Sequence, residues 1–135
     1  MRYFHNFFSV LQLSKYWGVT FGLDTGGEQK EQGSSKLNFW YAPIIIIQYK
    51  PDLKWAFAVR GENYTDKNGV IVPLVFSESL QMNGLSANVD YFITKNVLWR
   101  MEGRWLKNKR PYFFKQSSLI TTNTSFTTSL SIAIN

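Results

Sequence analysis

The chain has 135 residues, enough for one ordinary domain. It contains no cysteine, which excludes disulfide frameworks, thiolate zinc sites and thiol catalysis. The net charge is +6, but the cations are scattered, and the tightest cluster, Lys107, Lys109 and Arg110, has no flanking nucleic-acid motif. We therefore expect no nucleic-acid partner, no metal and no cofactor.

Catalytic and targeting signals are missing as well. The single histidine, His5, has no nucleophile or ligand pattern around it, and no G-x-S-x-G motif occurs. No apolar run is long enough for a transmembrane helix. The first residues do not form a signal peptide, because His5, Asn6 and Gln12 interrupt their apolar stretch. We expect a protein that is not an enzyme and that, if exported, is truncated at its N-terminus.

Apolar and polar residues alternate with a period of two along most of the chain, and helical periodicity is nearly absent. The pattern predicts irregular structure or a partial strand over residues 1–14, followed by an all-β antiparallel up-and-down meander of about six strands. The strands are expected at about 15–25, 36–49, 53–64, 80–93, 97–107 and 122–135. Residues 15–135 then form a single domain.

The predicted strand 36–49 is the least regular. Ile44–Ile47 is apolar on both faces, which also fits a buried strand. Pro43 lacks a backbone donor, so it predicts a bulge or a sheet edge.

Two predicted strands, 53–64 and 97–107, carry charged residues on one face and aromatic residues on the other. A soluble sheet would bury the aromatic face, whereas a membrane barrel turns it to lipid and lines a watery lumen with the charges. The pore-lining candidates are Arg60, Glu62, Arg100, Glu102 and Arg104. The alternative is that these residues form ion pairs that only brace the wall.

The connections between the predicted strands alternate in length. Tight turns at 50–52 and 94–96 separate long loops at about 26–35, 65–79 and 108–121. Short turns at one end and long loops at the other are the layout of outer-membrane barrels, with the short turns in the periplasm. A soluble meander has no reason to sort its loops in this way.

Aromatic residues are sorted by the same two ends. Two rings of aromatics are typical of proteins that cross both interfaces of a bilayer. The predicted lipid-facing girdle consists of Trp17, Tyr49, Trp55, Tyr91 and Trp99 near the short turns, and Trp105 near the long loops. Phe57 and Ile132 share the parity of this girdle and are also expected to face lipid.

Two stretches resemble the OmpL-like β-barrel porins of Gram-negative bacteria, with the Bacteroidetes branch most similar. They are Arg60–Gly69, which resembles an R-x-E-x-x-x-D-x-x-G signature, and Trp99–Trp105 with Phe113, Phe114 and Asn123, which resemble a closing hairpin. The resemblance covers about residues 15–135. It implies an integral outer-membrane barrel with a pore function. The end of the chain, Ile134-Asn135, departs from the terminal phenylalanine of many such barrels.

We therefore expect part of a porin-like, water-filled channel for passive passage of small polar solutes or ions in the bacterial outer membrane. About six strands cannot close a membrane barrel, so the expected partners are lipid and either the remaining strands of the barrel or other copies of the chain. One alternative is a small soluble β-barrel that binds a lipid or other apolar ligand in its interior. A soluble adhesion sandwich is a third hypothesis.

Overall fold

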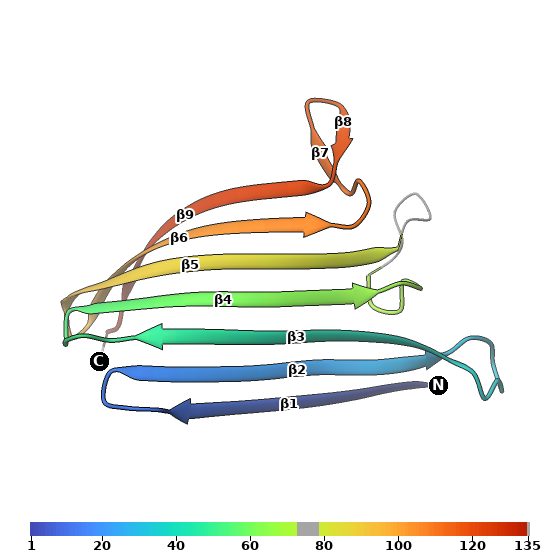
Figure 1. The fold of residues 1–135 in the computed structure, drawn as a ribbon, viewed down its shortest axis with the longest axis horizontal. Coiled ribbons are helices and arrows are strands. Elements are labelled where there is room, and N and C mark those ends of the chain that lie inside the picture. Colours follow the sequence, from blue (N-terminus) through green and yellow to red (C-terminus); the bar gives the residue numbers. More distant parts are fainter. Residues whose placement is uncertain (73–78, 135) are drawn as a thin grey trace.

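The computed structural model describes residues 1–72 and 79–134, and its described part contains strands and no helix. The strands are β1 (Arg2–Gln12), β2 (Trp17–Gln29), β3 (Leu37–Tyr49), β4 (Trp55–Asp66), β5 (Leu80–Thr94), β6 (Val97–Asn108), β7 (Phe113–Lys115), β8 (Ser118–Ile120) and β9 (Thr122–Ile132). Seven of them form one antiparallel sheet in the order β1-β2-β3-β4-β5-β6-β9 (Figure 1). Across the described ranges, no helix is long and apolar enough to cross a membrane.

The predicted all-β meander is confirmed, and its six expected strands correspond to β2–β6 and β9. Residues 1–14, expected to be irregular or a partial strand, contain the full-length strand β1, which pairs with β2 along its whole length. The predicted loop 108–121 contains the small hairpin β7–β8. Residues 73–78 of the predicted loop 65–79, and Asn135 at the end of the last predicted strand, lie outside the described residues.

The expectation of a bulge or an edge at Pro43 is wrong. Strand β3 is an interior strand, and Pro43 pairs with Leu23 of β2. Toward β4 the ladder passes directly from Tyr41↔Thr65 to Ile44↔Glu62 without a change of register. The missing donor of proline is thus accommodated by a local gap in the ladder. The register shift of the sheet lies instead between Phe92 and Thr94, beside the turn to β6.

Each short turn is held by a side-chain oxygen that accepts backbone N–H groups. The Ser14 hydroxyl accepts from Trp17, the Asp52 carboxylate accepts from Trp55 at 2.8 Å, and the Thr94 hydroxyl accepts from Asn96. Such local bonds favour turns over continued strands. Figure 1 shows these turns at one end of the meander and the longer connections at the other, as predicted.

The register sorts the side chains into two faces. Even-numbered residues of β1–β6 share one face with odd-numbered residues of β9, because every pair from β1 to β6 before the shift joins residues of equal parity. The first and last strands of this sheet, β1 and β9, pair on one side only and are exposed along almost their whole length.

Candidate functional site

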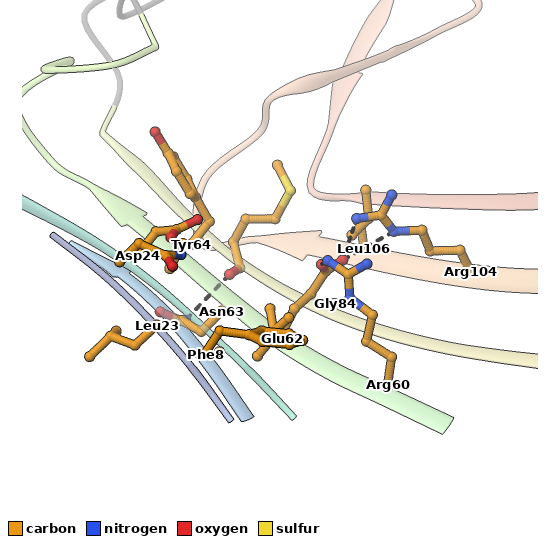
Figure 2. Close-up of a pocket in the computed structure, with 15 residues that line it drawn as sticks. Phe8, Leu23, Asp24, Arg60, Glu62, Asn63, Tyr64, Gly84, Arg104 and Leu106 are labelled. Atoms are coloured by element: carbon orange, nitrogen blue, oxygen red, sulfur yellow. Dashed lines mark hydrogen bonds and ion pairs between the residues drawn. The ribbon is translucent and has the colours of Figure 1, made fainter. Parts of the chain in front are cut away.

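A cavity of about 530 Å³ identifies the concave face of the sheet. Its lining comes from all six strands from β1 to β6, including Phe8 of β1 and Arg104 of β6 (Figure 2). Side chains of the first and sixth strands can reach the same cavity only if the sheet curls around it. The even-numbered face of β1–β6 is therefore the inner wall.

Three of the predicted pore-lining residues form one ion-paired group on this wall. Arg60 donates to Glu62 Oε2 at 2.5 Å, and Arg104 Nε donates to Glu62 Oε1 at 3.0 Å. Arg104 Nη2 also contacts Oε1, so both guanidinium groups share a single carboxylate (Figure 2). The group carries one net positive charge, and both arginine side chains remain partly exposed to the cavity side.

Gly84 of β5 makes this pairing possible. It lies opposite Glu62, between strands β4 and β6. A Cβ atom at this position would lie 2.5 Å from Glu62 Oε1 and 2.8 Å from a methyl group of Leu106. Glu62 therefore reaches Arg104 by lying over the bare backbone of β5. The sequence shows small residues on β5, but it does not indicate that the Glu62 side chain crosses β5 at Gly84.

The other two candidates lie farther toward the short turns. Arg100 forms a bidentate pair with Asp90 of β5, with both N–H···O distances at 2.6 Å. Asp90 is buried and also accepts from Asn88 at 3.0 Å. Glu102 lies between Asn88 and Thr127 in the register, on the same face. Asp90 is not among the pore-lining residues predicted from the sequence, although it directly faces Arg100 across the β5–β6 pair.

The inner wall carries apolar side chains as well. Phe8 of β1 and Ile44 of β3 line the cavity in the same row as Glu62, with which Ile44 pairs in the register. Nearer the long loops, Trp40 stacks on Phe4 with ring centroids 5.8 Å apart and lies 6.4 Å from the ring of Tyr64. The apolar run noted at Ile44–Ile47 thus has side chains on both faces, because Ile44 belongs to the inner wall. The wall thus has its arginine-rich group on β4–β6, while β1 and β2 add the Asn6–Asp24 contact and the Arg2–Glu28 pair beside apolar side chains.

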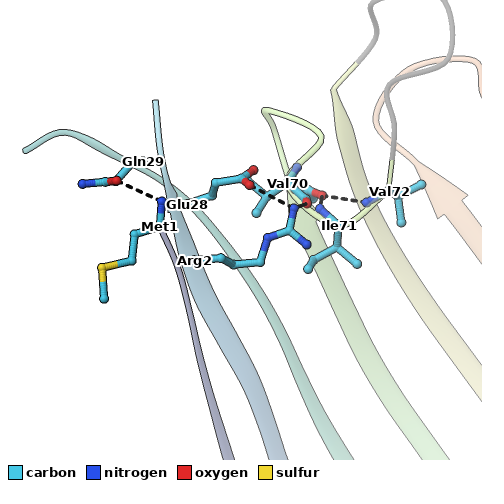
Figure 3. Close-up of polar contacts among 8 residues, drawn as sticks. Met1, Arg2, Glu28, Gln29, Val70, Ile71 and Val72 are labelled. Carbon is cyan, nitrogen blue, oxygen red and sulfur yellow. Dashed lines mark hydrogen bonds and ion pairs between the residues drawn. The ribbon is translucent and has the colours of Figure 1, made fainter. Parts of the chain in front are cut away.

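The first part of the β4–β5 connection, residues 67–72, folds over the long-loop end of the inner wall. Asp66 is fully buried, and its carboxylate accepts N–H groups from Val70 at 2.8 Å, Ile71 at 2.9 Å and Val72 at 3.2 Å. The carbonyl of Val70 accepts from Arg2 of β1 at 2.8 Å, and Arg2 also pairs with Glu28 (Figure 3). The segment that follows β4 therefore contacts the Arg2 side chain of β1.

The predicted girdle residues occupy the face opposite the cavity. Trp17, Trp55, Trp99 and Trp105 are exposed there, as are Phe57 and Ile132. Tyr49 and Tyr91 are half-buried because they pack against Trp17 and Trp55, each at a centroid distance of 4.6 Å. The aromatic residues are thus arranged along the outer side of the curved sheet.

In residues 1–72 and 79–134, no group of three or more His, Cys, Asp or Glu side chains is arranged to hold a metal ion. The site is a wall of mixed polarity, in which fixed charges, hydrogen-bonding groups and apolar side chains face one shared cavity.

The family model described as "Putative beta-barrel porin-2, OmpL-like" matches residues 1–134. No curated protein and no solved structure matches the chain.

Proposed function

The chain belongs to the OmpL-like β-barrel porin-2 family, and from this premise we propose that it forms part of the wall of a water-filled channel in the bacterial outer membrane. The solutes are small polar molecules or ions that pass without chemical change. In this role the pore-lining residues are Arg60, Glu62, Arg100, Glu102 and Arg104. The girdle residues Trp17, Tyr49, Trp55, Tyr91, Trp99 and Trp105 face lipid.

The observation that carries this proposal is the separation of charges and aromatics onto opposite faces of one curved sheet. The ion-paired group around Glu62 lines the cavity, while Trp55 and Trp99 are exposed on the other side. Charges that face a wet lumen cost little, whereas a cation on the lipid face at mid-bilayer costs about 2–4 kcal/mol. This distribution suits a membrane with water on the concave side.

The two edge strands imply partners within the membrane. Backbone groups in hydrocarbon must be hydrogen-bonded, so β1 and β9 need further strands beside them. We propose that these strands belong to the remainder of a larger barrel or to other copies of this chain. Lipid covers the outer face.

The soluble-barrel alternative requires the opposite arrangement, with the aromatic residues of the girdle in the interior of the barrel. A simple comparison separates the two functions. The membrane proposal expects the isolated chain to lose its β circular-dichroism signal and precipitate when detergent is removed. A chain that stays folded and monodisperse in plain buffer would favour the soluble barrel.

Conductance across a planar lipid bilayer tests the channel itself. We expect the complete protein to produce discrete, salt-dependent conductance steps. Absence of conductance in a preparation that is folded by circular dichroism would end the channel proposal.

A further inference from the structure

A polar notch interrupts the apolar outer face near its long-loop end. It has a volume of about 450 Å³ and is lined by Tyr41, Asn63, Thr65, Gln81, Asn83, Lys107 and Lys109. The register places Asn63, Asn83 and Lys107 side by side in one row on β4, β5 and β6, with Tyr41, Thr65 and Gln81 in the next row outward. These residues share the parity of Trp55 and Trp99, so the notch opens away from the lumen.

The polar groups of the notch are already ordered by contacts with one another. Thr65 donates to the Asn63 side chain at 3.0 Å, and Asn63 donates to Asn83 Oδ1 at 2.8 Å. Both Lys107 and Lys109 are exposed, and neither pairs with a carboxylate of residues 1–72 or 79–134. Two ammonium groups beside fixed amide and hydroxyl groups provide a site for an anion.

An apolar groove of about 340 Å³ begins where the notch ends. It is lined by Phe21, Pro43, Ile44, Ile45, Gly61, Glu62 and Asn63, and Asn63 belongs to both surfaces. The groove runs along the gap that Pro43 leaves in the β3–β4 ladder, and Gly61 contributes no side chain to fill it. It therefore provides a slot for a hydrocarbon chain directly below the notch.

The depth of the notch matches the level of a lipid headgroup. The row just below Asn63, Asn83 and Lys107 is Gly61, Leu85 and Trp105, which is apolar and carries a girdle tryptophan. Tryptophan side chains are enriched at the boundary between hydrocarbon and headgroups. The charged notch thus begins where the hydrocarbon ends.

We propose that this surface binds one lipid with a phosphate-bearing headgroup, in the leaflet on the long-loop side. Its phosphate lies between Lys107 and Lys109, its polar groups meet Asn83 and Gln81, and one acyl chain occupies the groove over Gly61. Charge complementarity and the adjacent apolar slot together select a phosphorylated lipid over a neutral lipid or a free anion. The proposal rests on the membrane placement proposed above and does not depend on an open channel.

The test is a lipid titration of the complete, delipidated protein in neutral detergent, followed by native mass spectrometry. The probes are diphosphorylated lipid A, the same lipid with its phosphates removed, and inorganic phosphate as a competitor. We expect the phosphorylated lipid to bind at least about fivefold more tightly than the dephosphorylated one, in line with the effect of a single lysine near a charged surface. Millimolar inorganic phosphate should not displace it.

Two pairs of variants locate the site. Lys107→Gln/Lys109→Gln should weaken binding at least about fivefold more than Lys36→Gln/Lys115→Gln, which removes the same charge elsewhere on the long-loop side. Gly61→Leu should weaken binding by filling the groove, whereas Gly103→Leu, on the same outer face with open space around it, should not. Circular dichroism confirms that each variant is folded.

Equal affinity for the two lipids, displacement by inorganic phosphate, or equal losses in the site and control variants would each overturn the proposal. A protein that binds lipid at this site but does not conduct would retain the lipid proposal and lose the channel. A protein that conducts but shows no lipid selectivity would retain the channel proposal and contradict the lipid proposal.

Discussion

Glu62 of β4 and Arg104 of β6 pair across the strand that separates them, over the backbone of Gly84. The contact crosses β5 at this glycine and not at the neighbouring small residues Ser86 and Asn88. Ser86 instead lies between Arg60 and Arg104 in the register, and Asn88 binds Asp90.

A double-mutant cycle measures this contact. Glu62→Gln and Arg104→Gln, alone and combined, should give a coupling free energy of about 0.5–1 kcal/mol in urea unfolding from phospholipid vesicles, since Arg104 is partly exposed. In a Gly84→Ala background the coupling should vanish, because the new methyl group displaces the Glu62 carboxylate. Gly103→Ala on the outer face of β6 is the control, since a Cβ there meets no neighbour within 4 Å. Undiminished coupling in Gly84→Ala would contradict the crossing geometry.

Neutralising Arg100 and Arg104 should shift the channel toward cations. The double variant Arg100→Gln/Arg104→Gln leaves the carboxylates of Asp90 and Glu62 without these partners, so the wall becomes more negative. Reversal potentials in a salt gradient report this shift, and lumen positions are the ones that tune selectivity. Lys36→Gln/Lys115→Gln removes two charges outside the wall and should change the potential less. A reversal potential unchanged from wild type would mean that Arg100 and Arg104 only stabilise the barrel wall through their ion pairs.

The sequence predicted the meander and its two faces because period-two alternation directly reflects the geometry of strands. Trp55 and Arg60 fall on opposite faces for this reason alone. Strand β1 was not recognised because Phe4, Phe7 and Phe8 place aromatic groups on both faces, which hides the alternation. The inner face of β1 mixes the polar residues Arg2 and Asn6 with the aromatic residues Phe4 and Phe8, so it lacks the regular charged ladder of β4 and β6.

The ion-pair partners could not be predicted because they depend on register between strands. Asp90 faces Arg100, and Asp24 accepts from Asn6 at 2.5 Å, only after the turns fix which residues are opposite. The role of Gly84 depends on the same register, together with the length of the Glu62 side chain. A single sequence contains the residues but not these pairings.

Arginine substitutions at adjacent residues of β4 should distinguish its two faces. Val59 is exposed on the outer side near the middle of the strand, and Ala58 faces inward. Val59→Arg should lower the free energy of unfolding by about 2–4 kcal/mol, whereas Ala58→Arg should change it much less. Trp99→Arg, near the short-turn end, should cost less than Val59→Arg and more than Arg100→Gln. Equal effects at positions 58 and 59 in vesicle unfolding would mean that the outer face does not meet lipid.

The Asp66 carboxylate should keep the start of the β4–β5 connection closed against the wall. It is fully buried and accepts three successive N–H groups, from Val70, Ile71 and Val72. Asp66→Ala leaves these donors without their acceptor, so the segment should open and trypsin should cleave more readily after Lys67, whose side chain is already exposed. We expect cleavage after Lys67 at least about tenfold faster than in wild type, which corresponds to a loss of about 1.4 kcal/mol in the closing free energy.

Asn68→Ala, within the same turn, is the control and should leave the rate of cleavage near that of wild type. Arg2→Ala, which removes the bond to the Val70 carbonyl, should give an intermediate rate, because it releases only one of the contacts that hold the loop. If Asp66→Ala is cut no faster than Asn68→Ala, the carboxylate does not hold the loop in solution.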